Sequence, residues 1–336
     1  MLQRILVPLD GSDRAERAMH VAARLARGSG SGCRILALRV VGLPPFRLAP
    51  YGEPAQIALA VIGVARDEAN DYVKRLALRP EFKDVQIKTR VIEGHVSDEI
   101  LDVARDEQCD MIVICTHGYS GLNRWRLGRV AAHVARHASA PVLVVPAHDD
   151  PGANRIADDH ARLLITLDGS ELAEAAIAPG LDVVRALAMP EHVTVHLLEV
   201  IDFFAAMMAE TPHQDASSPS PAIGAEEQAL RAARDYLETV AQRIHKEYPG
   251  VVVTTTAMLA SDIADTIITV AEEGAGHDFI AMGTHGRGGL QRWALGSIAE
   301  RVLHATHLPL ILARSADAVT HDRQVAEAKA DNALDR

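Results

Sequence analysis

The 336-residue chain contains only three cysteines, Cys33, Cys109 and Cys115, an odd count without paired metal-ligand spacing. This usage argues against a disulfide framework and favours a reducing compartment. No apolar run reaches the roughly 18 residues that a membrane-spanning helix needs. The opening MLQRILVPLDGS reads as a strand and a turn rather than a signal peptide. We therefore expect a soluble, cytoplasmic protein without membrane contact.

Positive charge is also in short supply. Lysine and arginine total 34 against 45 aspartates and glutamates, a net charge of −11. The acidic residues are spread over both halves, so non-specific binding to nucleic acids or anionic membranes is not expected. This balance leaves room for a local basic pocket.

Three familiar nucleotide motifs are absent from the sequence. No Gly-Lys dipeptide occurs, which excludes a P-loop with its lysine. The first strand of each half leads into LDGS instead of G-x-G-x-x-G, so the dinucleotide fingerprint is missing. No H-x-G-H signature of nucleotidyl transfer is present either.

What the chain does have is an internal repeat. RILVPLDGSDRAERA at 4–18 matches RLLITLDGSELAEAA at 162–176, and CDMIVICTHG at 109–118 matches HDFIAMGTHG at 277–286. Such self-similarity indicates two homologous domains. We predict domains at 1–147 and 160–315, a polar linker at 147–160, and a polar C-terminal tail at 316–336.

Short apolar runs alternate with helix-period segments in each half, which is typical of βαβ units around a buried parallel sheet. We predict an α/β fold with two Rossmann-like domains, each a five-stranded parallel sheet with helices on both faces. The expected strands lie near 3–9, 33–41, 85–92, 110–115 and 141–146, and near 162–168, 193–201, 250–258, 278–283 and 308–313. Helices are expected between them, including 55–78 and 226–248.

The segment GTHGRGGLQRWALGS at 283–297 carries the main chemical signal. Ser297 and Glu300 match a capping box, which predicts a helix N-terminus with Ser297 as its cap. Free amides at a helix start, approached through glycines, favour a phosphate. Asp10 and Asp168 follow the first strand of each half, where a carboxylate can accept hydrogen bonds from ribose hydroxyls. Ser12 and Ser170 read as helix N-caps.

These residues resemble the universal stress protein family in its tandem form, over about 2–314. The family's nucleotide motif, G-x-x-G, nine residues and G-[S/T], fits the second half at every fixed position. The resemblance implies an adenine nucleotide alpha hydrolase-like fold and ATP as ligand, with or without Mg²⁺. Asp168 is expected near the ribose and the Val200 backbone near adenine. The remaining expected ATP contacts are Thr166, Met282, Gly283, His285, Gly286, Gly296, Ser297 and Ile298.

The first copy of the loop, CTHGYSGLNRWRLGR, departs from the motif at both ends. Cys115 replaces the leading glycine, Arg129 replaces the serine, and Ala132 removes the capping glutamate. One interpretation is an impaired site, because the cap and a phosphate ligand are lost; the other is an altered site in which Arg129 binds phosphate directly. The remaining residues of this weaker or altered site are Asp10, Val40, His117, Gly118 and Gly128.

The function that we expect is a non-catalytic, ATP-dependent regulator of stress physiology with an unidentified protein partner. A slow ATP-hydrolysing enzyme and a nucleotide-independent dimeric scaffold remain alternatives. No catalytic residue is assigned. His133 and His137 share the i, i+4 spacing of zinc ligands, but the H-E-x-x-H glutamate is missing, so no metal site is expected. By the resemblance, Pro141–Val145 and Pro309–Ala313 are expected to pair as a pseudo-two-fold dimer within the chain, and further homodimerisation is open.

Overall fold

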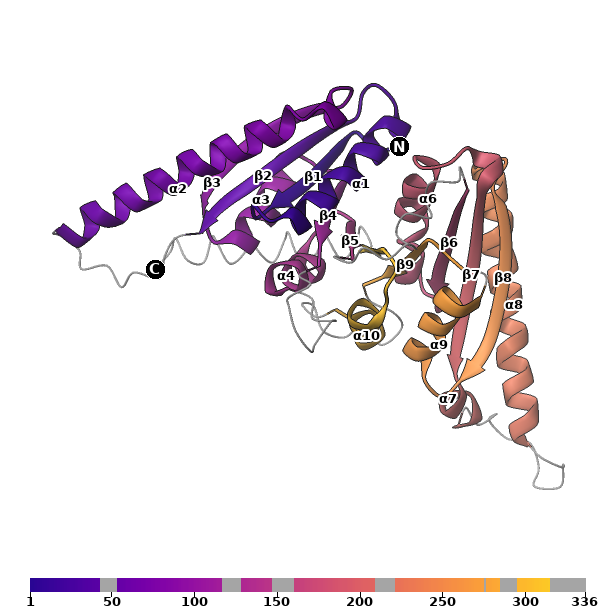
Figure 1. The fold of residues 1–336 in the computed structure, drawn as a ribbon. Helices are drawn as coiled ribbons and strands as arrows, with labels where there is room; N and C mark the ends of the chain where they lie inside the picture. Colours follow the sequence, from indigo (N-terminus) through magenta and orange to yellow (C-terminus); the bar gives the residue numbers. More distant parts are fainter. Residues whose placement is uncertain are drawn as a thin grey trace, which may run out of the picture. The chain divides into compact units, whose positions relative to one another are not determined.

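A parallel sheet forms the centre of the first half in the computed structural model (Figure 1). The structure describes residues 1–42, 53–116, 128–146, 160–208, 221–274, 276–284 and 295–314. The strand order is β3-β2-β1-β4-β5, and neighbouring strands are parallel. The strands are β1 (Arg4–Leu9), β2 (Arg34–Gly42), β3 (Gln86–Gly94), β4 (Met111–Cys115) and β5 (Val142–Val145).

The second half repeats this topology. Its order is β10-β9-β6-β7-β8, again with parallel neighbours. The strands are β6 (Ala161–Leu167), β7 (Val193–Asp202), β8 (Val252–Ala260), β9 (Phe279–Gly283) and β10 (Leu310–Ala313). All ten predicted strands are found, and no boundary differs by more than two residues. Both sheets are central to an α/β fold, as predicted.

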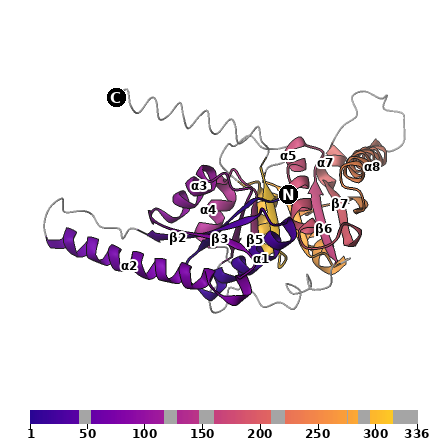
Figure 2. The ribbon, with the colours of Figure 1, turned by 90° about the horizontal axis from the view of Figure 1, so that it is seen from above.

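Helices cover the sheets. In the first half they are α1 (Asp13–Ser29), α2 (Glu53–Ala77), the short η1 (Pro80–Phe82), α3 (Val96–Asp106) and α4 (Arg129–His137). Figure 2 shows α1 and α2 on one face of the sheet and α3 and α4 on the other. The second half has α5 (Glu171–Glu174), α6 (Ile177–Arg185), η3 (Pro190–His192), α7 (Phe203–Met208), α8 (Pro221–Glu247), α9 (Ile263–Thr269), η4 (Val270–Gly274) and α10 (Ser297–Ala305).

The chain separates into two units, Met1–Asp149 and Asp150–Arg336. The predicted linker falls almost wholly at 147–159, outside the described residues, and so does the predicted tail at 316–336. Each unit has its own apolar core. Ile5, Leu6 and Met111 are fully buried in the first, and Leu163, Leu164 and Phe279 in the second.

One helix differs between the repeats. The first unit has the continuous α1, whereas the matching segment of the second is divided into α5 and α6. Pro179 explains the division, because proline has no amide hydrogen and its ring clashes with the carbonyl four residues earlier. Gly180 then allows close packing on the sheet. A Cβ atom there would lie 3.0 Å from Leu163 Cδ2 and 3.1 Å from the Ala281 Cβ.

A pair of histidines, His277 buried and His196 half-buried, joins β7 to the segment before β9. His196 Nδ1 lies 3.2 Å from His277 Nε2, and its Nε2 lies 2.8 Å from Thr256 Oγ1. His277 Nδ1 lies 3.2 Å from the Ala271 carbonyl oxygen. With two neutral rings every contact has one donor and one acceptor: His277 donates to Ala271, His196 donates to His277, and Thr256 donates to His196. Burial lowers the pKa of both histidines.

We predict that this pair makes stability depend on pH. Because the folded pKa values lie below the ordinary value, the folded state binds fewer protons than the unfolded chain in acid. The stabilisation is complete above about pH 6.5 and is lost as the pH falls, by at most about 1.4 kcal/mol per pH unit for each proton. Urea unfolding from pH 8 to pH 5 should show this slope. His196→Leu with His277→Cys, the residues at the matching positions Leu36 and Cys109, should flatten it, whereas the exposed-site variant His245→Gln should not. An unchanged slope in the double variant contradicts the assignment.

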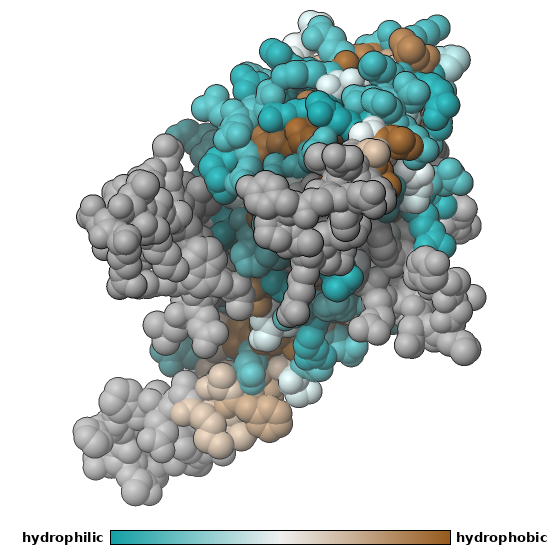
Figure 3. Space-filling model, turned by 90° about the vertical axis from the view of Figure 1, so that its left-hand side faces the viewer, coloured by the Kyte–Doolittle hydropathy of each residue, from teal (hydrophilic) through white to brown (hydrophobic). Residues whose placement is uncertain are grey.

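One face of the described residues is mainly hydrophilic (Figure 3). On this face, apolar residues occur as small separate patches among hydrophilic ones (Figure 3). Among the described helices, none is both long enough and apolar enough to cross a membrane.

Candidate functional site

Each unit has one switch point, the place in the sheet where the strand order reverses direction. From β1 the chain proceeds to β2 and β3 on one side, and later to β4 and β5 on the other. Ligands of open α/β sheets bind outside the carboxyl ends of the two strands where the order reverses. These strands are β1 and β4 in the first unit and β6 and β9 in the second, paired through Leu6↔Ile112 and Thr166↔Met282. The candidate sites lie at these ends.

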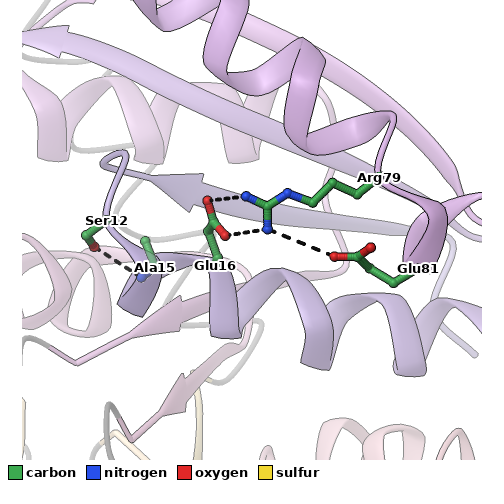
Figure 4. A network of polar contacts seen from close by, with 5 residues as sticks. All are labelled: Ser12, Ala15, Glu16, Arg79 and Glu81. Atoms are coloured by element: carbon green, nitrogen blue, oxygen red, sulfur yellow. Dashed lines mark hydrogen bonds and ion pairs between the residues drawn. The ribbon is translucent and has the colours of Figure 1, made fainter.

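An Asp-Gly-Ser turn follows the first strand of each unit. In the first, Asp10 Oδ1 accepts hydrogen bonds from the Ser12 amide (2.9 Å) and hydroxyl (2.6 Å), and Ser12 Oγ accepts from the Ala15 amide (3.2 Å; Figure 4). Gly11 has a φ of 85°, in the left-handed region that favours glycine. Ser12 is the N-cap of α1, as predicted.

The second unit repeats this turn closely. Asp168 Oδ1 accepts from the Ser170 amide (3.0 Å) and hydroxyl (2.6 Å), and Ser170 caps α5 by accepting from the Ala173 amide. Gly169 has a φ of 78°. The turn thus fixes the orientation of a carboxylate at the strand end in both units.

The capping box predicted at Ser297 is wrong. Helix α10 begins at Ser297, its N-cap is Gly296, and no side chain caps it. The Glu300 amide donates to the Gly296 carbonyl at 2.8 Å, which places Glu300 one position beyond the place that a capping box requires. Ser297 is therefore the first helical residue. It is exposed, and its hydroxyl is not used for capping.

The first unit starts its helix in the same way. The N-cap of α4 is Gly128, again without a side-chain cap, and the Ala132 amide donates to the Gly128 carbonyl at 2.9 Å. Gly128 and Gly296 have similar backbone angles, φ −63° and ψ 148° against φ −57° and ψ 145°. The expectation that the first copy has lost a side-chain cap present in the second is therefore wrong, because both helices have a glycine N-cap and neither has a side-chain cap.

Two described positions at the ends of the loop differ between the units: Cys115 stands against Gly283, and Arg129 against Ser297. Cys115 ends β4 and pairs with Val145, and Gly283 ends β9 and pairs with Ala313, so the backbone register is the same. The Cys115 thiol is buried, and burial raises its pKa to about 12, with Arg17 and Arg14 acting in the opposite direction. A neutral thiol is not a nucleophile. Arg129, the other difference, is the exposed first residue of α4.

The remaining predicted residues lie near these strand ends. Thr166 and Met282 are buried neighbours on β6 and β9. Val40 and Val200 occupy matching places near the ends of β2 and β7, and Ile298 is half-buried in the first turn of α10. The predicted contacts His117, Gly118, His285 and Gly286 lie outside the described residues.

His133 and His137 face each other on α4. Their ring centroids are 4.1 Å apart, and His137 Nδ1 lies 2.8 Å from the His133 carbonyl. His133 Nε2 lies 3.6 Å from Asp98 Oδ1. Within the described part of the chain, no cluster of three or more histidines, cysteines or carboxylates is arranged to hold a metal ion.

Motif analysis missed a polar network behind the Asp-Gly-Ser turn. Glu16 is buried, and both of its carboxylate oxygens bind the Arg79 guanidinium, at 2.7 and 3.1 Å (Figure 4). In the second unit Glu174 binds both the Tyr236 hydroxyl (2.9 Å) and Arg243. These partners are more than 60 residues apart, so no short motif contains them. The first network joins α1 to the segment that follows α2, and the second joins α5 to α8.

Comparison with known proteins agrees with this architecture. The model of the universal stress protein family matches residues 1–146 and 160–314. The chain belongs to the universal stress protein family. Both halves match, so it is a tandem member.

Relatives and solved structures are of the same kind. A universal stress protein of Methanocaldococcus jannaschii is 33% identical over 146 residues, 43% of this chain and 82% of that protein. One of Mycobacterium tuberculosis is 26% identical over 337 residues, 92% of this chain and 94% of that protein. A crystal structure of a universal stress protein from Archaeoglobus fulgidus covers 94% of this chain and 99% of its own, with 18% identity and a TM-score of 0.63. This last similarity supports the fold.

Proposed function

We propose that the second half of this universal stress protein binds ATP and that the chain acts as a non-catalytic, nucleotide-dependent regulator in the cytoplasm. The observation that carries the proposal is a hydrogen bond between Thr284 and Gly296, near the two ends of the glycine loop (residues 283–297). The Gly296 amide donates to the Thr284 carbonyl at 2.8 Å, so the start of α10 lies at the carboxyl end of β9. Strand β6, which leads to Asp168, is the neighbour of β9. The carboxylate and the helix start therefore share one switch point.

The chemistry of this place suits a nucleotide. The first amides of α10 have no side-chain cap, and the partial positive charge of a helix start favours phosphate. The exposed Ser297 hydroxyl is a further donor for a phosphate oxygen. The Asp168 carboxylate is an acceptor for ribose hydroxyls, and the β7 backbone near Val200 offers peptide groups to a base edge.

The regulatory part of the proposal needs a surface that differs between the nucleotide-bound and free states, because a ligand shifts an equilibrium only through differential affinity. Catalysis needs a positioned base or a metal-binding group beside the phosphates. Asp168 Oδ1 is used by Ser170 in the turn, which favours a positioning role over that of a base. The predicted pairing of 141–145 with 309–313, homodimerisation and the partner protein remain predictions.

Asp168→Asn tests the ATP site. Asparagine keeps a side-chain oxygen for Ser170 but loses the charge that strengthens bonds to ribose hydroxyls. We expect ATP affinity to fall about 10- to 100-fold, the equivalent of about 1.5–3 kcal/mol for hydrogen bonds to a charged group. Isothermal titration calorimetry in about 0.5 M NaCl, where exposed charges are screened, should show about one ATP per wild-type chain.

Asp10→Asn is the matched control, because its turn has the same geometry in the other unit. It should leave the high-salt binding unchanged. Equal affinity of wild type and Asp168→Asn, with both folded, contradicts the proposed site. Phosphate release followed over hours in the same samples separates binding from slow hydrolysis: a rate that exceeds the no-protein control and disappears with Asp168→Asn supports the enzyme alternative.

A further inference from the structure

The two switch points carry different charges. The strand register makes the comparison position by position, because Leu9 pairs with Arg39 as Leu167 pairs with Glu199. Four arginines of the first unit match non-basic residues of the second. Two are aligned by their distance from the Asp-Gly-Ser turn, one by this strand pairing, and one by the glycine N-cap that precedes it. The matches are Arg14 with Leu172, Arg17 with Ala175, Arg39 with Glu199, and Arg129 with Ser297.

Two of these arginines lie on α1. This helix begins directly after the Asp10 turn and packs against β1 and β4. Arg14 and Arg17 are in its first two turns, and both guanidinium groups act electrostatically on Cys115 at the end of β4. Arg17 is half-buried and Arg14 is exposed. They therefore add positive charge at the strand end where the glycine loop begins.

The third arginine lies beside the Asp10 turn. Arg39 Nη1 donates to the Leu9 carbonyl at 3.2 Å, which holds its guanidinium at the end of β1. At the matching position of the second unit, Glu199 is a buried carboxylate. The first unit thus has a guanidinium group, and the second a buried carboxyl group, next to the residue whose backbone is expected to meet the base, Val40 or Val200.

Arg129 is the fourth. It is the first residue of α4, where the helix dipole is positive, and the first turn of α4 contains no acidic residue. The first turn of α10 contains Glu300. A cation at this end is unfavourable for the helix itself, so its placement points to an anion. The acidic residues of α1 do not offset the difference, because Asp13 and Glu16 have acidic counterparts in Glu171 and Glu174.

We infer that the first unit binds a nucleoside polyphosphate through an arginine-lined site, and that it selects for negative charge where the second unit selects for the nucleoside. The inference rests on the proposed function in one respect: each unit is taken to bind its ligand at the carboxyl ends of the strands of its own sheet. The Asp10 turn is retained with the geometry of its counterpart, which keeps the place for a ribose. Guanidinium groups bind phosphate oxygens in pairs, and such contacts weaken as salt rises.

Inorganic tripolyphosphate is the probe, because it carries the charge of the ligand without the nucleoside. The full chain with Gly296→Leu serves as background, because a leucine before the uncapped amides of α10 blocks the phosphate position of the second site. At about 0.05 M NaCl, where the Debye length exceeds 10 Å, calorimetry should detect binding of about one tripolyphosphate per chain. Affinity should fall at least 10-fold at about 0.5 M NaCl. ATP should bind this background at low salt and lose that binding at high salt.

Replacement of the arginines by the second unit's residues should remove this binding. Arg14→Leu, Arg17→Ala and Arg129→Ser, combined in the same background, should lower tripolyphosphate affinity at least 30-fold. Arg129→Glu alone, an exposed change that leaves the fold intact, should lower it at least 10-fold. An equally exposed control, Arg75→Glu on α2, should not change it.

Two results overturn the inference. One is the absence of tripolyphosphate binding in the Gly296→Leu background at low salt. The other is binding that persists unchanged in the triple variant and in Arg129→Glu. Neither affects the high-salt ATP binding by the wild-type chain, which tests the second unit. Failure of the two proposals is therefore distinguishable.

Discussion

Gly296→Leu is expected to reduce ATP binding by the second unit at least 100-fold, equivalent to about 2.7 kcal/mol. The reason is space rather than conformation. Gly296 has a φ of −57° and a ψ of 145°, which leucine adopts without strain, so the helix should still form. The new side chain would stand directly before the uncapped amides of α10, where a phosphate has to approach the backbone closely. Calorimetry at about 0.5 M NaCl measures the loss.

Gly128→Leu provides the matched control, because Gly128 has nearly the same backbone angles at the start of α4. It should leave the high-salt ATP binding intact. Circular dichroism and the thermal midpoint of both variants should match those of the wild type, which shows that the fold is retained. A folded Gly296→Leu protein with wild-type affinity for ATP would mean that the phosphates do not lie at this helix start.

The fold could be predicted from the sequence because its central strands, such as β1 and β4, are buried on both faces. Short apolar runs such as ILVPL and MIVIC are typical of strands in a covered parallel sheet, and each has a counterpart, LLITL or FIAMG, in the second half. The turns were predictable for a similar reason. Asp10, Gly11 and Ser12 interact only with residues nearby in the sequence in forming this turn and helix cap, so the turn is recognisable as a short motif.

The start of α10 shows where such reading fails. Ser297 and Glu300 have the spacing of a capping box, but that spacing does not state which residue is the cap. Glycine is also a good N-cap, and Gly296 takes the position, so that the serine moves one place into the helix. The consequence for function is large. A serine used as a cap is occupied by the backbone, whereas a serine at the first helical position can contact a ligand.

The polar networks could not be predicted because their members are distant in sequence. Glu16 reads as an ordinary first-turn glutamate on α1, favourable to the helix dipole. Only the packing of α1 beside the segment that follows α2 shows that Glu16 is buried and bound to Arg79. The repeat does contain a signal, since Glu174 and Arg243 stand at corresponding places, but an isolated pair of charges more than 60 residues apart is common by chance.

Arg79→Ala is expected to destabilise the first unit by about 2–3 kcal/mol. The substitution removes both hydrogen bonds to Glu16, whose side chain is only 10% exposed, and leaves its carboxylate buried without this cation. Breaking a fully buried pair typically costs about 3–5 kcal/mol. The Arg79 side chain is 40% exposed, so the value is reduced for solvent screening. Urea unfolding of the full chain, followed by circular dichroism, measures the change.

A second substitution separates the pair from simple packing. Glu16→Met in the Arg79→Ala background removes the buried charge, so stability should return to within about 1 kcal/mol of the wild type. Arg75→Ala, an exposed change on the preceding helix α2, should cost no more than about 0.5 kcal/mol. Arg243→Ala in the second unit should cost less than Arg79→Ala, because the Glu174 side chain is 21% exposed against 10% for Glu16, and Glu174 keeps its hydrogen bond from Tyr236. If Glu16→Met adds to the loss instead of reversing it, the Glu16 carboxylate is stabilised by groups other than Arg79.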